Sequence, residues 1–189
     1  MEFYDNEPEV RAAIARSNHR ELIGGLWDEV GTLQLEFLKA QGLRPDMSLL
    51  DLGCGSGRFA VKAVPYLTNG RYGGVDISQA LLEAAKAELS SIGVSSERYD
   101  LHRTPDFLPS SGMSSQFDFG IAQSVFTHLP LSELERALRA IASRFLSGRF
   151  FATFFVAPPD SKSFTHSPGG IVSFPDRDPF HFTVEQIGA

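Results

Sequence analysis

Apolar residues in the middle of the chain follow two alternating patterns. Five short apolar runs have the length and composition of strands, at 48–52, 71–77, 98–102, 117–125 and 149–157. Between them, apolar positions recur every three or four residues, as in amphipathic helices, at 59–67, 78–92 and 132–145. Strands that alternate with helices in this way predict an α/β fold with a doubly wound, mainly parallel sheet.

Polar residues at the ends of these segments refine the prediction. Ser78 is expected to cap the second helix, and Ser132 with Glu135 forms a capping box that is expected to open the third. The last strand, Arg149 to Ala157 (RFFATFFVA), is apolar almost throughout. Such a strand is typical of a sheet that is covered on both faces.

The two ends of the chain follow other patterns. From His19 to Gln41 the spacing is helical, but three glycines predict a broken helix or two short ones. Residues 158–179 contain five prolines and are predicted to form a loop. Residues 180–183 are expected to be extended, and a helix is expected to begin at Thr183.

Composition narrows the class of protein. The 189 residues suit one globular domain, with 42% hydrophobic and 21% charged residues. A net charge of −6 gives no basic face for nucleic acid, and the single cysteine excludes an internal disulfide and a cysteine-based metal cluster. No apolar run has the length of a membrane span, and the acidic N-terminus does not resemble a signal peptide. We therefore expect a cytoplasmic protein without a membrane or nucleic-acid partner.

The segment from Leu49 to Gly57, followed by Asp76, carries the chemistry. Glycines in a turn between a strand and a helix let a ligand approach the backbone closely. An acidic residue at the end of the second strand can accept hydrogen bonds from ribose hydroxyls, and Asp76 stands 19 positions after Gly57 (76 − 57).

Asp51 discriminates between two classes of cofactor. Gly55, Gly57 and Ala60 formally satisfy the dinucleotide pattern G-x-G-x-x-A, which leaves an NAD-dependent oxidoreductase as an alternative. However, Asp51 lies two residues before Gly53, the first glycine of the turn, and its carboxylate would repel a pyrophosphate. The same carboxylate suits a cofactor that bears a positive charge and an amine.

The pattern Asp51-x-Gly53-x-Gly55-x-Gly57 resembles the first motif of the class I S-adenosylmethionine-dependent methyltransferases, and the resemblance covers about residues 45–157. It implies a Rossmann-like sheet. It also implies that Asp51, Gly53 and Gly55, with Cys54 in the same turn, hold the methionine part of the cofactor. Asp76 would then bind the ribose.

The resemblance extends to later segments. Ile77 would lie beside the adenine, and Asp106 with Phe107 resembles the third motif, which contacts the adenine edge. The backbone near Gln123 would lie by the cofactor, and residues 124–128 would face the methyl acceptor. His128 is the candidate general base, which is needed only for a hydroxyl or a protonated amine; the alternative is a residue at a helix entry. The other four histidines lack metal-ligand spacing, so no metal is expected.

The acceptor is expected to be a small organic molecule. Enzymes of the family that methylate adenine or amide nitrogens carry an Asn/Asp-Pro-Pro-Tyr/Phe tetrapeptide after the fourth strand, where this chain has Gln123-Ser124-Val125-Phe126. The resemblance divides the chain into three regions: a helical cap or lid (1–44), a cofactor-binding core (45–157), and a loop with an incomplete C-terminal element (158–189).

The chain departs from the family at its end. The sheet of a class I methyltransferase has seven strands. In this chain no segment after the fifth strand is expected to form the last two. The strand at 149–157 would therefore be an exposed apolar edge. We expect association into a homodimer through that edge. A nucleotide-fold protein that lacks activity because it is truncated is the main alternative to a methyltransferase.

Overall fold

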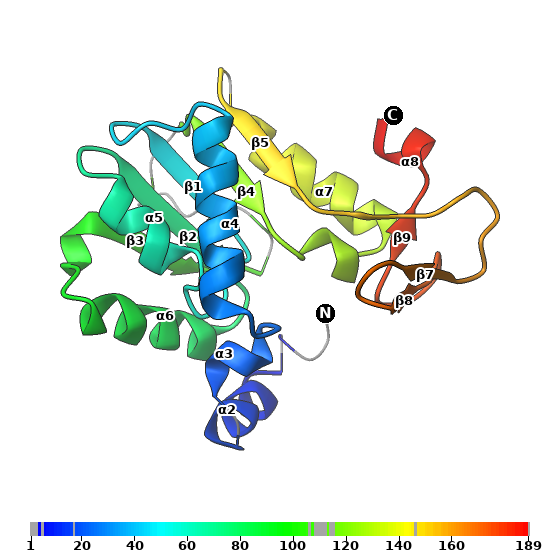
Figure 1. Cartoon of the computed structure of the whole chain (residues 1–189), viewed down its shortest axis with the longest axis horizontal. Helices are drawn as coiled ribbons and strands as arrows, with labels where there is room; N and C mark the ends of the chain where they lie inside the picture. Colours follow the sequence, from blue (N-terminus) through cyan, green and yellow to red (C-terminus); the bar gives the residue numbers. More distant parts are fainter. Residues whose placement is uncertain are drawn as a thin grey trace.

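The computed structural model describes residues 4, 6–16, 18–105, 107, 113, 116–145 and 147–188. Its centre is a parallel sheet of five strands in the order β3-β2-β1-β4-β5 (Figure 1). The strands are β1 (Ser48–Leu52), β2 (Arg71–Asp76), β3 (Tyr99–Arg103), β4 (Phe119–Ala122) and β5 (Arg149–Ala152). The predicted fold class is confirmed. Strand addition reverses direction between β1 and β4, and this is the place where open α/β sheets bind ligands.

Helices cover both faces of the sheet. The helices are α4 (Trp27–Ala40), α5 (Ala60–Tyr66), α6 (Gln79–Ser91) and α7 (Leu131–Ala142). Residues of α4, α5 and α6 pack into one apolar core with β1, β2 and β4. Residues of α7 join a second core on the opposite face, around Leu50, Leu52 and Val75. Ser78 caps α6 as predicted, since its hydroxyl accepts a hydrogen bond from the Leu81 amide at 3.3 Å.

The broken N-terminal helix is also confirmed. A short helix, α3 (His19–Leu22), is separated from α4 by a turn at Gly24 and Gly25, while an additional helix, α2 (Glu7–Arg16), precedes it. Gly31 does not interrupt α4. It lets the helix approach α5, because an added Cβ there would lie 2.7 Å from the carbonyl oxygen of Arg58.

The capping box predicted at Ser132 is wrong. Helix α7 begins one residue earlier, at Leu131, and its cap residue is Pro130, without a side-chain hydrogen bond. The Pro130 carbonyl accepts from the amides of Glu133 and Leu134, both at 3.0 Å. Proline fixes its own φ, so it sets the start of the helix ahead of the serine.

The predicted strand at 149–157 is split in two. Only β5 belongs to the sheet; the chain then turns away, and β6 (Phe155–Val156) pairs in parallel with β9 (His181–Phe182). The expected cover on both faces is present at β5, since Phe151 packs against one core and Phe150 against the other. Within the described residues β5 is nevertheless the edge of the sheet, and both side chains are only half-buried.

The proline-rich segment is more ordered than predicted. It contains an antiparallel hairpin of β7 (Phe164–His166) and β8 (Ile171–Ser173). The extended piece expected at 180–183 contains β9, and the expected helix is α8 (Val184–Gly188). This C-terminal segment lies beside α7, beyond the end of β5 (Figure 1). In the described part of the chain no helix is both long and apolar enough to cross a membrane.

Candidate functional site

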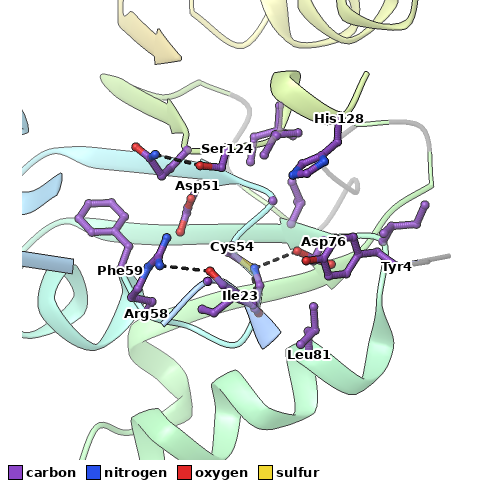
Figure 2. A pocket seen from close by; sticks show the side chains of 18 of the residues that line it. Tyr4, Ile23, Asp51, Cys54, Arg58, Phe59, Asp76, Leu81, Ser124 and His128 are labelled. Atoms are coloured by element: carbon purple, nitrogen blue, oxygen red, sulfur yellow. Dashed lines mark hydrogen bonds between the residues drawn. The ribbon is translucent and has the colours of Figure 1, made fainter. Parts of the chain in front are cut away.

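A cavity of about 370 Å³ opens at the carboxyl ends of β1, β2 and β4. Its size lies in the range of small-molecule sites. Most of its wall comes from the N-terminal residues, the turn after β1, the end of β2, the segment after β3 and the loop after β4, and α4 and α6 contribute one residue each (Figure 2). The wall consists of Tyr4, Leu22, Ile23, Gly24, Gln34, Asp51, Leu52, Gly53, Cys54, Gly55, Arg58, Phe59, Val75, Asp76, Ile77, Leu81, Thr104, Pro105, Phe107, Gln123, Ser124, Val125 and His128.

The glycine turn after β1 brings bare backbone to the cavity. Gly53, Gly55 and Gly57 all have positive φ, at 74°, 55° and 89°. The amides of Gly53 and Cys54 donate to the Val75 carbonyl at 2.8 and 3.0 Å, which ties the turn to β2. A side chain at Gly53 would clash with the Cγ2 of Val125. The turn therefore needs glycine both for its conformation and for space.

Asp76 holds this turn in place. One carboxylate oxygen accepts from the Gly55 amide at 2.8 Å, and the other accepts from the Ser78 amide at 2.9 Å. Burial raises the pKa of Asp76, and the backbone hydrogen bonds oppose that effect. Each oxygen keeps a further acceptor position, so the carboxylate can also accept from a ligand hydroxyl. Ile77 follows it on the cavity wall.

Asp51 is a buried carboxyl group at the end of β1. It is 2% exposed and accepts a hydrogen bond from the Tyr72 hydroxyl at 2.5 Å. Burial raises the pKa of Asp51 to about 7, and the Tyr72 hydrogen bond opposes the increase. A cationic ligand group at this wall would stabilise the ionised form.

Gln34 supplies an unsatisfied acceptor on the wall of the same cavity. The side chain, on α4, is 6% exposed, and its Oε1 has no hydrogen-bond partner among the described residues. A buried acceptor without a partner costs about 1–3 kcal/mol. A donor group on a ligand would remove that penalty. Arg58 lies nearby and donates to the carbonyls of Ile23 and Gly25, at 3.2 and 3.0 Å.

The N-terminal segment is attached to the core beside the cavity. Glu7 caps α6, because its carboxylate accepts from the amides of Gln79 and Ala80 at 3.1 and 2.6 Å. Arg20 forms a two-point ion pair with Glu88, with both distances at 2.8 Å. These contacts hold the segment that brings Tyr4, Leu22 and Ile23 to the cavity wall.

The loop after β4 forms the opposite wall. Ser124 has a φ of 57°, and its amide donates to the Thr153 hydroxyl at 2.8 Å. His128 belongs to a single 3₁₀ turn, η2 (Phe126–His128), so it precedes α7 rather than entering it. Figure 2 shows the imidazole at the rim, on the same side of the cavity as Tyr4 and Asp76. Its Nδ1 lies 2.7 Å from an oxygen of Asp178.

The structure places nine of the ten predicted site residues on one cavity wall. They are Asp51, Gly53, Cys54, Gly55, Asp76, Ile77, Phe107, Gln123 and His128. The tenth, Asp106, lies outside the described residues. The Cys54 thiol is buried, which raises its pKa well above the ordinary value and keeps it protonated. In the described part of the chain, no three potential metal-ligand side chains gather.

The sequence analysis missed Tyr4, Gln34, Arg58 and Asp178. Arg58 directly follows Gly57, so its position in the sequence indicated that it would lie beside the glycine turn. Tyr4, Gln34 and Asp178 reach the site only through tertiary packing, and their local sequence gives no sign of it.

The chain resembles known proteins both in sequence and in structure. A family model described as "Methyltransferase domain" matches residues 50–148. Magnesium protoporphyrin IX methyltransferase from Synechocystis PCC 6803, with bound SAH, is similar at 17% identity and a TM-score of 0.64, over 98% of this chain and 83% of that one. A TehB-like SAM-dependent methyltransferase from Corynebacterium glutamicum is similar at 20% identity and a TM-score of 0.55, over 77% of this chain and 72% of that one.

A further similar structure is coclaurine N-methyltransferase bound to N-methylheliamine and SAH, at 21% identity and a TM-score of 0.56. The match covers 66% of this chain and 36% of that one. Two other matched structures are covered over 22% and 51% of their lengths, so the chain spans only part of several of the proteins that it resembles. At these identities the likeness shows the fold.

Proposed function

We propose that this chain, which belongs to the methyltransferase domain family, is an S-adenosylmethionine-dependent methyltransferase that acts on a small organic molecule. The observation that carries the proposal is the cavity at the β1/β4 reversal. There the glycine turn, the buried Asp51 and the backbone-bound Asp76 meet.

The residues of the cavity fit this cofactor. Asp51 and the unsatisfied Gln34 oxygen are acceptors for its ammonium group, and the glycine turn leaves room for its methionine part. Asp76 accepts from the ribose hydroxyls, while Ile77 and Phe107 border the adenine. Similar proteins were crystallised with SAM or SAH, which supports the assignment. When bound, the cofactor supplies an electrophilic methyl group on a sulfonium.

The chain's own contribution is alignment and exclusion of water. Orienting two reactants can contribute roughly 7–11 kcal/mol to the barrier reduction of such a transfer. Ser124, Val125 and His128 form the side of the cavity that would face the acceptor. A small acceptor agrees with the net charge of −6 and with the small-molecule ligand in the coclaurine N-methyltransferase structure.

The three predicted regions remain part of the proposal. Residues 1–44 act as a lid, which is supported by the Glu7 and Arg20 contacts to α6 and by the cavity-lining Tyr4 and Ile23. Residues 45–157 hold the cofactor. Residues 158–189 are proposed to support the acceptor side.

We also propose a homodimer through the β5 edge. In the described residues β5 is the last strand of the sheet, and its Phe151 packs edge-to-face on Phe37 at 5.1 Å between ring centroids. Phe37 is 42% exposed on α4, beside that edge. An apolar strand edge next to an exposed aromatic ring favours pairing with a second chain.

Titration calorimetry with S-adenosylmethionine, S-adenosylhomocysteine and NAD tests the function. The two adenosyl ligands should bind and NAD should not. Asp76→Ala should weaken their binding at least about tenfold, because hydrogen bonds to a charged group are worth about 1.5–3 kcal/mol. Asp100→Ala is the matched control, since Asp100 on β3 pairs with Arg71 on β2 and does not line the cavity.

Two outcomes would overturn the proposal. Binding of NAD without the adenosyl ligands would favour an oxidoreductase. Binding of none of the three would favour a nucleotide-fold protein without catalytic activity. If Asp76→Ala changes the affinity no more than the control does, the ribose assignment is wrong.

A further inference from the structure

We propose that Asp178 is a positioning residue that holds His128 ready to take a proton from the acceptor. The inference rests on the proposed function and deepens it, because it narrows the acceptor to a group that must lose a proton, a hydroxyl or a protonated amine. Asp178 lies in the C-terminal segment, 50 residues after His128 in the sequence, and the family match ends before it.

The contact between the two side chains sets the tautomer of the imidazole. Asp178 Oδ1 lies 2.7 Å from His128 Nδ1. A carboxylate can only accept, so in the neutral ring the proton is on Nδ1 and Nε2 keeps its lone pair. The two side chains are 37% and 41% exposed, so water and a substrate can both reach the pair.

The backbone under His128 is fixed by aromatic packing. In the same 3₁₀ turn, the fully buried Phe126 stacks on Phe154, with 5.6 Å between ring centroids. The His128 amide donates to the Val125 carbonyl at 3.0 Å, which closes the turn. These contacts hold the imidazole on the cavity wall.

The loop that carries Asp178 is bound to that same turn. The Phe180 amide donates to the Thr127 carbonyl at 2.7 Å, which joins the loop to the residue before His128. Within the loop, the Phe174 amide donates to the Pro179 carbonyl at 2.8 Å, and the His181 amide donates to the Phe174 carbonyl at 2.9 Å. The carboxylate is therefore held beside the imidazole by backbone bonds on both sides.

Two further titratable or charged side chains lie on the segments next to the pair, Tyr4 and Arg177. Tyr4, from the N-terminal segment, packs edge-on to the His128 ring with 6.4 Å between centroids. Burial raises the pKa of the Tyr4 hydroxyl, and the charges of Asp76 and Asp178 raise it further, so Tyr4 stays neutral. Arg177, in the loop itself, has its guanidinium over the Phe174 ring at 3.7 Å from the centroid.

The arrangement supports one proton transfer. The O–H or N–H bond of the acceptor breaks, and its proton joins His128 Nε2. The electron pair left on the heteroatom would form the new bond to the methyl group while the bond between that methyl group and the sulfonium sulfur breaks. The electron pair of the broken bond would stay on the sulfur, which leaves as a neutral thioether. The imidazolium then carries protons on both nitrogens, and the Asp178 carboxylate stabilises it. The proton passes to water afterwards, so no additional reactant is required.

Nitrogen NMR of the protein labelled at histidine, bound to S-adenosylhomocysteine, tests this without an acceptor. We expect the neutral His128 ring as the Nδ1–H tautomer. In Asp178→Asn this tautomer should lose its preference, because an amide side chain can donate to Nδ1 as well as accept from it. Asp176→Asn removes the same charge from the same loop and should leave the Nδ1–H tautomer in place.

The two proposals have separate readouts. The inference is wrong if the neutral His128 ring of the wild-type protein is the Nε2–H tautomer, or if Asp178→Asn leaves the tautomer unchanged. Calorimetry with S-adenosylhomocysteine on the same variants tests the proposed function, and it should give wild-type affinity for Asp178→Asn. If the wild-type protein does not bind S-adenosylhomocysteine, the proposed function is wrong, whichever tautomer His128 adopts.

Discussion

Three aspartates at the site owe their different properties to their surroundings. Asp51 is buried and receives one hydroxyl hydrogen bond, while Asp76 is bound by two backbone amides. Asp178 is half-exposed beside an imidazole. Local spacing was enough to predict the first two, because they belong to strands next to the glycine turn. It did not predict Asp178, because its partner lies in another part of the chain.

Cofactor binding should release a proton from Asp51. The pKa of its carboxyl group is raised to about 7 by burial, and a bound ammonium would lower it again. Affinity for S-adenosylmethionine should therefore rise with pH up to about 7 and level off above it, with roughly half a proton released at pH 7. Calorimetry in two buffers of different ionisation enthalpy measures this release.

Asp51→Asn is the control for that prediction. The variant should bind more weakly and release no proton at pH 7. Proton release that persists in Asp51→Asn would assign the titration to another group, of which Asp76 is the nearest candidate, since burial raises its pKa as well.

Gly53→Ala should abolish cofactor binding and lower the free energy of unfolding. Comparison of that free energy with the value for Gly42→Ala separates the cost of the backbone conformation from the cost of the clash. Both glycines have positive φ, at 74° and 103°, but an added Cβ meets Val125 at Gly53 and open space at Gly42. The Gly42 variant should lose about 1–2 kcal/mol of unfolding free energy for its backbone alone. The Gly53 variant should lose about 1–3 kcal/mol more for the clash. Equal losses in urea unfolding would contradict the role of the clash.

Elements were predicted well where their own pattern decides them. The five strands and three helices of the core were predicted from apolar spacing, because each buries an apolar face in the sheet or against it. The division between β5 and β6 was not predicted, because the apolar run continues to Ala157. The hydrogen bonds to β4 end earlier, at the Thr153 amide. The β7–β8 hairpin was not predicted, because the five prolines of residues 158–179 favoured a loop. Of the site, the turn and strand ends were predictable, whereas the contributions of Tyr4 and Gln34 were not.

Helix α2 is expected to matter through its cap on α6. Glu7→Ala removes the carboxylate that accepts from Gln79 and Ala80, so unfolding free energy should fall by about 1 kcal/mol. The affinity for S-adenosylmethionine should also fall, because the same segment brings Tyr4 to the cavity. Glu9→Ala, an exposed change on the same helix, should stay within about 0.5 kcal/mol of the wild type. Thermal unfolding and calorimetry compare the two variants.

At the scale of the whole molecule, the β5 edge with the exposed Phe37 beside it predicts association with a second chain. The proposed dimer should appear in sedimentation velocity as a sedimentation coefficient that rises with protein concentration. Phe37→Glu should shift the equilibrium toward the monomer, because the charge would be desolvated in a dimer. Ile92→Glu, at the exposed C-cap of the far helix α6, should leave the equilibrium unchanged. A wild-type protein that is monomeric at all concentrations would refute the dimer.

The loop bound to η2 also has a consequence for biosynthesis. The residues assigned to the cofactor, including Gln34 on the lid, have all been translated by Val125, but the carboxylate opposite His128 is added only at position 178. At about 5–20 residues per second, ribosomes need roughly 3–10 s for that interval. A nascent chain should therefore acquire the ability to hold its cofactor before it can bind an acceptor productively.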